Sequence, residues 1–167
     1  LPEIEIVKRS LSKMINKSKI IAVKINNKNL RYKLPHAFSQ NLIGEKILRV
    51  SRRSKYLIFH FKKKLLLAHF GMSGKILLIR GSDNAVFKTS FYYDFNILPK
   101  HNHVYFKLNN GLILIYNDVR RFGFFKLFEN IKLKEITHLK KLGPEPFSVS
   151  FCIKYFKKFI KNRKKNI

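Results

Sequence analysis

Apolar residues recur at helical spacing over the first seventeen positions of the chain. The side chains that fall on one face of a 3.6-residue period are Ile4, Val7, Leu11, Met14 and Ile15. Pro2, Glu3 and Glu5 stand in the first turn, where a proline is tolerated and the helix dipole favours negative charge. This pattern predicts an amphipathic helix over residues 2–17. A second, short helix is expected near residues 36–42.

The middle of the chain instead contains short runs of β-branched and aromatic residues, which are typical of strands. Eight such runs span residues 19–25, 46–51, 56–61, 65–70, 75–79, 103–108, 112–116 and 124–128. Turn-forming residues lie between several of them, including Gly81-Ser82 and Asn110-Gly111. So many closely spaced strands indicate a sandwich or a barrel. We expect an α+β, mainly β fold: a two-layer β-sandwich of about eight strands preceded by the N-terminal amphipathic helix.

Beyond about residue 131 the apolar spacing becomes helical again. One predicted helix lies within residues 133–143, where Gly143 and the prolines that follow it end the pattern. The apolar positions of a second helix are Phe151, Tyr155, Phe156, Phe159 and Ile160. Such a helix needs further protein against which to bury its apolar face. We therefore expect a β-sandwich domain with its leading helix over residues 1–130, and a linker with the first helices of a second, helical domain over residues 131–167.

The balance of charges points to a partner. Lysine and arginine number 36 and aspartate and glutamate 9, which gives a formal net charge of +27. So large a positive charge opposes compaction and favours a polyanionic partner, whose counterions are released on binding. Some of the lysines are simply solvated surface, because they occur with many Asn, Ile and Phe, as A/T-rich coding produces. Aromatic residues lie beside basic ones throughout, and no lysine-rich helix with a broad apolar face dominates, so nucleic acid is favoured over an acidic membrane.

The remaining composition excludes several classes of protein. Hydrophobic residues make up 46% of the chain, which is enough for a sizeable core. Cys152 is the one cysteine, so neither an intrachain disulfide nor a cysteine-based zinc site can form within the chain. The acidic N-terminus is unlike a secretory signal, and no apolar run reaches the ~18 residues of a spanning helix. A soluble, cytoplasmic protein is expected, with no cofactor held by this chain.

The turn in residues 116–125, YNDVRRFGFF, combines groups that ordinary hairpins do not need. Apolar runs lead into it and out of it, and between them Phe122 stands beside two permanent cations, Arg120 and Arg121. A large apolar ring placed beside two guanidinium groups is hard to explain as ordinary hairpin structure.

Five segments, in this order, resemble a single protein family. They are LPEIE (1–5), RRSKYL (52–57), HFGMSG (69–74), NDVRRFG (117–123) and LGPEPF (142–147). Each alone is weak, but together they extend over nearly the whole chain and resemble formamidopyrimidine-DNA glycosylase, the base-excision enzyme for oxidised purines. The related endonuclease VIII branch shares the architecture, yet LPEIE, GMSG and LGPEP resemble the formamidopyrimidine branch.

The resemblance implies a bacterial, DNA-associated repair enzyme that acts as a monomer on double-stranded DNA. Its substrates would be 8-oxoguanine and formamidopyrimidines, and abasic sites. Such an enzyme everts the damaged nucleotide, removes the base through Schiff-base chemistry and then cleaves the strand by elimination as an abasic-site lyase.

Three residues are implied to enter the duplex. In the family these are the methionine of GMSG and the arginine and phenylalanine of RRFG, which here are Met72, Arg120 and Phe122. An apolar plug replaces lost stacking, and a guanidinium satisfies the orphaned partner base. Core packing is the alternative for Met72 and Phe122, but the glycines and arginines beside them favour loop tips. For Arg121 the alternative is an ion pair with a carboxylate.

Three further cationic positions match the family. Lys55 matches its active-site lysine, which contacts phosphate beside the lesion and is credited with proton donation during strand cleavage; a plain solvent or phosphate contact is the alternative. His101 matches a DNA-binding position, and Lys164 a phosphate-contacting lysine whose alternative is a solvated tail charge. The chain departs from the family at Asn102, where aspartate is usual, and at Val119, where proline is usual. We expect the valine to loosen the turn but to leave the side chains after it in place.

Other catalytic parts of the family are expected outside the chain. The family opens Met-Pro-Glu-Leu-Pro-Glu-Val-Glu, and the amine of its terminal proline attacks C1′ of the damaged nucleotide beside a proton-managing glutamate. Leu1 matches the family's leucine, so Pro2 and Glu3 match the second Pro-Glu, and the Pro2 nitrogen is an amide without a nucleophilic lone pair. The catalytic pair is therefore expected upstream. A helix-two-turn-helix region and a zinc finger with its zinc ion are expected after Ile167, and the chain alone is expected to be inactive.

Other functions stay open at this point. A non-catalytic, basic nucleic-acid-binding module would bind in a salt-sensitive manner without preferring lesions. An endonuclease VIII-type glycosylase would act on pyrimidine lesions. A basic structural protein of a ribonucleoprotein is disfavoured by the ordered match of five segments.

Overall fold

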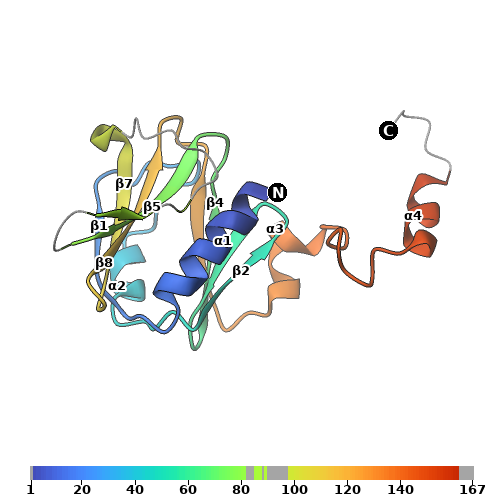
Figure 1. Cartoon of the computed structure of the whole chain (residues 1–167), viewed down its shortest axis with the longest axis horizontal. Helices are drawn as coiled ribbons and strands as arrows, with labels where there is room; N and C mark the ends of the chain where they lie inside the picture. The colour runs from blue at the N-terminus through green and yellow to red at the C-terminus, as the bar shows by residue number, and fades with distance from the viewer. Residues whose placement is uncertain (1, 82–84, 88, 90–97, 162–167) are drawn as a thin grey trace. The chain divides into compact units, whose positions relative to one another are not determined.

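The computed structural model describes residues 2–81, 85–87, 89 and 98–161 of the chain. The chain divides into two compact units, Leu1–Ile131 and Lys132–Ile167 (Figure 1). The first unit contains the β-sheets, and the second contains short helices.

Two antiparallel sheets make up the first unit (Figure 1). One has the strand order β1-β7-β8-β5-β6, with the bounds Ile20–Ile25, Asn102–Leu108, Leu112–Asp118, Gly74–Arg80 and Val86–Phe87. The other has the order β2-β3-β4-β9, with the bounds Arg49–Arg53, Tyr56–His60, Lys64–His69 and Phe124–Glu129. The expected two-layer β-sandwich is confirmed, and each of the eight predicted runs forms a strand. The sequence pattern does not predict β6, because two residues are too few to show an alternation.

The pairing of the strands brings two sheet-to-sheet connections to the same end of the sandwich. β4 pairs with β9 so that His69 faces Phe124, and β5 pairs with β8 so that Gly74 faces Asp118. The turn from β4 to β5 and the loop from β8 to β9 therefore both pass from one sheet to the other, starting from paired residues. Segments about fifty positions apart in the sequence are side by side as a result.

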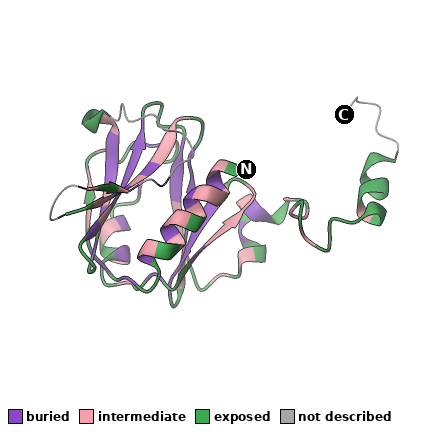
Figure 2. Cartoon of the chain, viewed as in Figure 1, coloured by how far each residue is buried: buried purple, intermediate pink, exposed green. Residues whose placement is uncertain are grey.

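Two helices cover parts of the first unit. α1 (Pro2–Ile15) packs against β2 and β3 through its apolar stripe, whose buried members are Ile4, Val7, Leu11 and Ile15 (Figures 1 and 2). α2 (Phe38–Leu42) packs against β1, and a 3-10 turn, η1 (Pro99–His101), precedes β7. α1 ends two residues earlier than predicted because Lys17 has a positive φ of 68° and its N–H bonds to the carbonyl of Ile47 at 2.7 Å.

Aromatic rings fill the space between the sheets. Tyr116, which is fully buried, meets Phe125 edge-on with ring centroids 4.9 Å apart. Phe38 from α2 lies against Phe106 and Phe125 at 6.4 and 6.1 Å. Edge-to-face and tilted contacts of this kind stabilise a core beyond the apolar area that they bury. The ends of β8 and β9 are therefore held rigidly from inside.

The second unit is less regular than predicted. In place of one helix within residues 133–143 there are two short turns, η2 (Leu133–Glu135) and α3 (Thr137–Lys140), because the backbone of Ile136 between them is extended. α4 (Ile153–Ile160) forms as predicted, and none of its residues is buried. Among the described residues, no helix combines the length and apolar character needed to cross a membrane.

A buried histidine makes the stability of the sandwich depend on pH. His60, at the end of β3, lies 2.7 Å from the Ser51 hydroxyl through its Nε2 atom and is 8% exposed. Burial and the nearby charge of Arg49 lower the pKa of His60 from 6.5 to about 4. In this pH window the unfolded chain binds a proton that the folded chain does not.

We predict that the free energy of unfolding falls as the pH is lowered from 6.5 toward 4, because the folded state resists protonation of His60. Denaturant titrations at several pH values measure this slope. In His60→Gln, whose amide retains a partner for Ser51, the slope over this window should be smaller. An unchanged slope in that variant would assign the pH dependence to other groups.

Candidate nucleic-acid interface and active-site pocket

One buried carboxyl group organises the loop between β8 and β9. Asp118 is 0% exposed, and each of its oxygens accepts two hydrogen bonds. Oδ1 accepts from the Ser73 hydroxyl at 2.5 Å and the Arg120 N–H at 3.3 Å. Oδ2 accepts from the Tyr116 hydroxyl and the Gly123 N–H, both at 2.9 Å. Four donors offset the cost of burying this group and fix the loop at both of its ends.

The donors around Asp118 are themselves fixed. Burial, together with the charge and the hydrogen bond of Asp118, raises the pKa of Tyr116, so its hydroxyl stays protonated and donates. The Ser73 hydroxyl also accepts the N–H of Arg120 at 3.1 Å. Nε2 of the buried His103 lies 2.7 Å from the main-chain oxygen of Asp118. The turn after β4 and the loop after β8 are therefore joined in one hydrogen-bonded network.

Two glycines allow these two segments to touch. Gly71 has a φ of +63°, and a Cβ there would lie 2.8 Å from the carbonyl carbon of Phe122. A Cβ on Gly123 would overlap the Tyr116 hydroxyl and lie 2.5 Å from the main-chain oxygen of His69. Real Cβ atoms do not approach so closely, so side chains at either position would push the turn and the loop apart.

The result is a projecting group of three side chains, which we name the insertion tip: Met72, Arg120 and Phe122. The Arg120 guanidinium lies 3.4 Å from the Met72 sulfur and 4.5 Å above the Phe122 ring. Met72 is 77% exposed and Phe122 46% exposed, so the core-packing alternative is wrong for both. The alternative for Arg121 is an ion pair with a carboxylate, and within the described residues Arg121 forms none.

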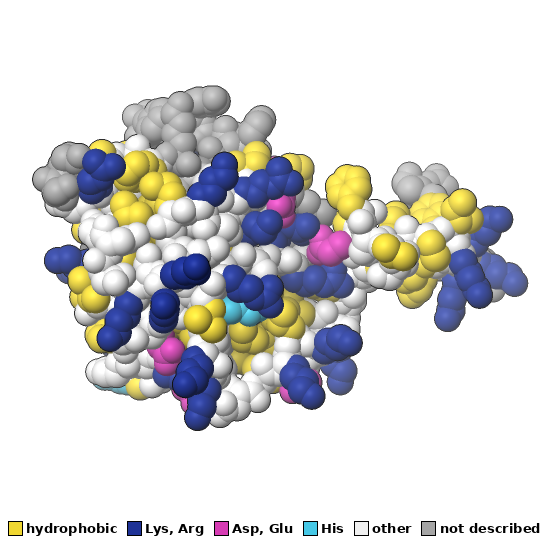
Figure 3. All heavy atoms as spheres, turned by 60° about the horizontal axis from the view of Figure 1, so that its bottom comes forward, with side chains coloured by type: hydrophobic (Ala, Val, Ile, Leu, Met, Phe, Trp, Pro, Cys, Tyr) yellow, Lys and Arg dark blue, Asp and Glu magenta, His cyan; other side chains and the backbone are white. Residues whose placement is uncertain are grey.

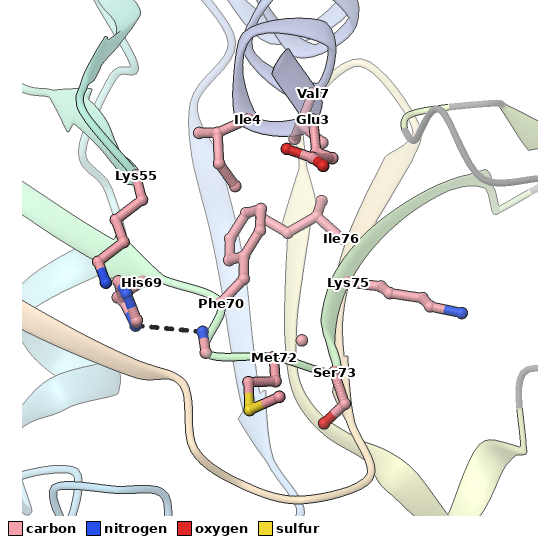
Figure 4. Close-up of a pocket in the computed structure, with 12 residues that line it drawn as sticks. Glu3, Ile4, Val7, Lys55, His69, Phe70, Met72, Ser73, Lys75 and Ile76 are labelled. Carbon is pink, nitrogen blue, oxygen red and sulfur yellow. Dashed lines mark hydrogen bonds between the residues drawn. The ribbon is translucent and has the colours of Figure 1, made fainter. Parts of the chain in front are cut away.

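A pocket of about 350 Å³ lies against this tip, which we name the Lys55 pocket (Figure 4). Its walls come from α1 through Glu3 and Ile4, from the β2–β3 turn through Lys55, and from the turn after β4 through Phe70 and Met72. Figure 4 shows the Lys55 side chain reaching toward His69, with Glu3 on α1 across the pocket. Lys55 and Met72 are thus brought together, as residues of one hollow.

An ion-pair cluster fixes the turn that carries Lys55. Glu5 on α1 accepts hydrogen bonds from Lys8, Arg9 and Arg52 at 2.9–3.0 Å. Partial burial alone would raise the pKa of Glu5, but the bonds from Arg52, Lys8 and Arg9 outweigh it and lower the pKa to about 2. Arg52 also donates to the main-chain oxygen of Ser54 at 2.8 Å. α1 is therefore tied to the residue directly before Lys55.

His69 is a pocket residue that the sequence analysis does not single out. It is buried, and its Nδ1 accepts the N–H of Gly71 at 3.1 Å, so a proton on the neutral ring sits on Nε2. The ring stacks on Phe124 at 5.3 Å and lies 5.2 Å from the Tyr56 ring. Its position in HFGMSG, two residues before Gly71, is the signal that could have identified it.

The other predicted site residues lie elsewhere. His101 ends η1, is half-buried and does not line the Lys55 pocket. Beside it, Asn102 is buried and its side-chain oxygen accepts the Asn117 amide at 2.7 Å, so an asparagine is fully accommodated where the family has aspartate. Val119 is exposed in the loop. Lys164 lies outside the described residues.

Positive side chains are spread widely over the surface. Figure 3 shows many lysines and arginines and few carboxylates on one face of the chain. In the described ranges, no three His, Cys, Asp or Glu side chains gather as they would around a metal ion.

The β-sandwich with its lysine-lined pocket has the architecture of the N-terminal domain of base-excision DNA glycosylases. The family model described as formamidopyrimidine-DNA glycosylase N-terminal domain matches residues 1–125, and the chain belongs to this family. The resemblance carried by the five sequence segments is thereby confirmed.

Relatives with this family's name match almost the whole chain. The formamidopyrimidine-DNA glycosylase of Bartonella tribocorum is 42% identical over 98% of the chain and 56% of its own length. That of Streptococcus agalactiae is 37% identical over 100% of the chain and 56% of its own length. The chain thus spans little more than half the length of the curated relatives that it matches.

Solved structures of a Lactococcus lactis relative have the same fold. Its complex with DNA containing an abasic site superposes with a TM-score of 0.80 at 32% identity, covering 97% of the chain and 56% of that protein. Its complex with DNA containing a FAPY-dG lesion has a TM-score of 0.78 at 31% identity, covering 96% and 56%.

We predict that Asp118→Asn lowers the free energy of unfolding by about 2–3 kcal/mol, because an amide nitrogen would replace one oxygen that accepts two donors. Ser73→Ala, which removes one donor, should cost only about 1 kcal/mol. Urea denaturation of both variants measures the two losses. Equal stability of Asp118→Asn and the parent chain would show that the four bonds do not hold the loop.

Proposed function

We propose that this chain is the lesion-engaging part of a base-excision DNA glycosylase that acts on oxidised purines in duplex DNA and then cleaves the strand at the abasic site. The observation that carries the proposal is the position of the exposed insertion tip directly beside the Lys55 pocket. A wedge and a receiving hollow are the two things needed to take a nucleotide out of a stack.

Extruding a nucleotide costs a few kcal/mol of stacking and pairing. Met72 and Phe122 would enter the vacated space and replace part of the lost stacking. The Arg120 guanidinium, already lying over the Phe122 ring, would donate to the acceptors of the unpaired partner base. The main chain of Arg120 is already held in the absence of DNA, because its N–H donates to Asp118 and Ser73.

The pocket would receive the everted nucleotide. About 350 Å³ lies at the lower end of the range for small-molecule sites. Lys55 supplies a positive charge at its mouth for the phosphate beside the lesion, and it is the proposed proton donor during strand cleavage. His101 and Lys164 are proposed as further phosphate contacts.

The nucleophile of the proposed reaction is a secondary amine. Attack of this amine on C1′ forms a C–N bond as the base leaves with the bonding electrons, and the resulting iminium makes the 2′ hydrogen acidic, so that elimination breaks the strand. Pro2 cannot perform the attack in this chain because Leu1 acylates its nitrogen. We propose that the amine belongs to the first proline of the family's opening motif, in register before Leu1.

We predict that borohydride does not trap the 167-residue chain on duplex DNA containing 8-oxoguanine, whereas it traps a version restored with Pro-Glu before Leu1 and with a family C-terminal region. The control is the restored protein with one alanine placed ahead of the proline, which acylates its nitrogen and should abolish trapping. Trapping of the 167-residue chain would show that the proposed register is wrong. A restored protein without lesion preference would favour the non-catalytic binding module.

We also predict that Phe122→Ala in the restored enzyme lowers lesion processing by about tenfold, a typical value for loss of one stacking ring, while affinity for undamaged duplex changes little. Single-turnover cleavage and anisotropy titrations give the two quantities. Phe147→Ala, which removes an exposed ring in the second unit, is the control and should leave both unchanged. Equal losses of processing and plain affinity in Phe122→Ala would contradict the insertion role.

A further inference from the structure

A second hollow meets the insertion tip away from the Lys55 pocket. Its volume is about 680 Å³, and we name it the arginine groove. The residues that line it are Asn29, Leu30, Arg31, Arg120, Arg121 and Phe122. The tip thus borders two hollows: Met72 faces the Lys55 pocket, while Arg120 and Phe122 face the arginine groove.

The far wall of the groove is a small hairpin. An antiparallel bridge between Asn29 and Lys33 places Arg31 at the apex of the turn between them. The Arg31 N–H donates to the main-chain oxygen of Gly123 at 3.2 Å. Tyr32 lies edge-on to Phe124 at 5.0 Å. The hairpin is therefore docked onto the loop that carries the tip, and the groove between them is a formed feature of the fold.

The groove is strongly cationic. Arg31, Arg120 and Arg121 are all exposed, and within the described part of the chain none of the three forms an ion pair. The carboxyl group that precedes the loop, Asp118 at the end of β8, is fully buried and already accepts four hydrogen bonds. Three guanidinium groups that have no ion-pair partner among the described residues favour phosphate oxygens, which they can bind through paired N–H donors.

We propose that the arginine groove holds the sugar-phosphate backbone of the strand opposite the lesion, with Arg31 and Arg121 as its phosphate contacts. This inference rests on the proposed function. A wedge inside a duplex has one strand on each side of it. If the damaged strand turns its nucleotide into the Lys55 pocket, the partner strand passes the other face of the tip, where Arg31 and Arg121 lie.

The test compares duplex and single-stranded DNA. Fluorescence anisotropy with the 167-residue chain measures binding to a duplex that contains a tetrahydrofuran abasic-site analogue, and to the lesion strand alone. The variants are Arg31→Gln and Arg121→Asn, the latter because asparagine tolerates the φ of 56° at this position. The matched control is Arg49→Gln, an exposed arginine on β2 about 13 Å along the strand from Arg53 and so at the end of the hairpin away from Lys55.

We expect each groove variant to weaken duplex binding by roughly three- to tenfold and to reduce the salt slope by about one, while single-strand binding stays as in the parent. Arg49→Gln should change duplex and single-strand binding equally. Equal losses on duplex and single strand in the Arg31 and Arg121 variants would overturn the assignment to the opposite strand.

A second measurement identifies the strand directly. Neutral methylphosphonates placed one at a time in either strand remove single phosphate charges. A methylphosphonate in the strand opposite the lesion should weaken DNA binding by the parent chain but have little further effect on binding by Arg31→Gln. A methylphosphonate in the lesion strand should weaken DNA binding by both proteins alike. The reverse pattern would place Arg31 on the lesion strand. If the parent chain shows no preference for the lesion duplex over undamaged duplex, the proposed function itself fails. If the parent chain prefers the lesion duplex but the methylphosphonate substitutions do not distinguish it from Arg31→Gln as expected, the groove assignment alone is wrong.

Discussion

The buried carboxyl group of Asp118 is the constraint on which the rest of the site depends. A carboxyl group is stable at that depth only when donors surround it, and here they come from Ser73, Tyr116, Arg120 and Gly123. Ser73 belongs to the turn after β4, Tyr116 to β8 itself, and Arg120 and Gly123 to the loop after β8. Satisfying one buried group therefore also fixes Met72 relative to Arg120 and Phe122, with no need for contacts among the exposed side chains themselves.

The pairing of the strands also fixes the turn after β4 and the loop after β8 relative to each other. Because Gly74 pairs with Asp118 and His69 with Phe124, both sheet-to-sheet connections start from adjacent strand ends. The Tyr116 and Phe125 rings pack between the sheets at this point and hold those ends. The position of the tip is thus determined by the core, while its side chains remain in solvent. A probe that must enter a base stack needs both properties: rigid attachment and an exposed apolar surface.

Much of the fold follows from the sequence because its signals are local. Alternation and β-branched residues identify the eight longer strands, and the apolar stripe from Ile4 to Ile15 identifies α1. Where the structure differs, the decisive contact is distant or the element is too short. α1 stops early because Lys17 bonds to Ile47, and the predicted helix after residue 132 is interrupted at the extended Ile136. No spacing rule within a single segment contains that information.

For the candidate site, the sequence predicts which residues lie at loop tips but not which distant residues hold those tips together. The motifs around Met72 and Phe122 indicate loop tips, but the bond from Ser73 to Asp118 joins residues 45 positions apart and has no local pattern. The place of His69 beside Lys55 also depends on a distant contact, the pairing of β3 with β4, although its position within HFGMSG marks it locally as a neighbour of the turn. Arg31 carries no motif at all and meets the tip only through the docked hairpin.

At two positions, Val119 and Asn102, the chain departs from the family's residues, and at both of them hydrogen bonds to distant residues keep the local geometry. Val119 replaces a proline that would restrict the turn, yet the next residue is still held, because the N–H of Arg120 bonds to both Asp118 and Ser73. Asn102 replaces an aspartate, and its side-chain oxygen still accepts a bond from Asn117 on the neighbouring strand. In both places the hydrogen-bond network preserves the geometry although the residue has changed. The tip can therefore tolerate sequence change in its own loop as long as the buried acceptor at its base keeps its donors.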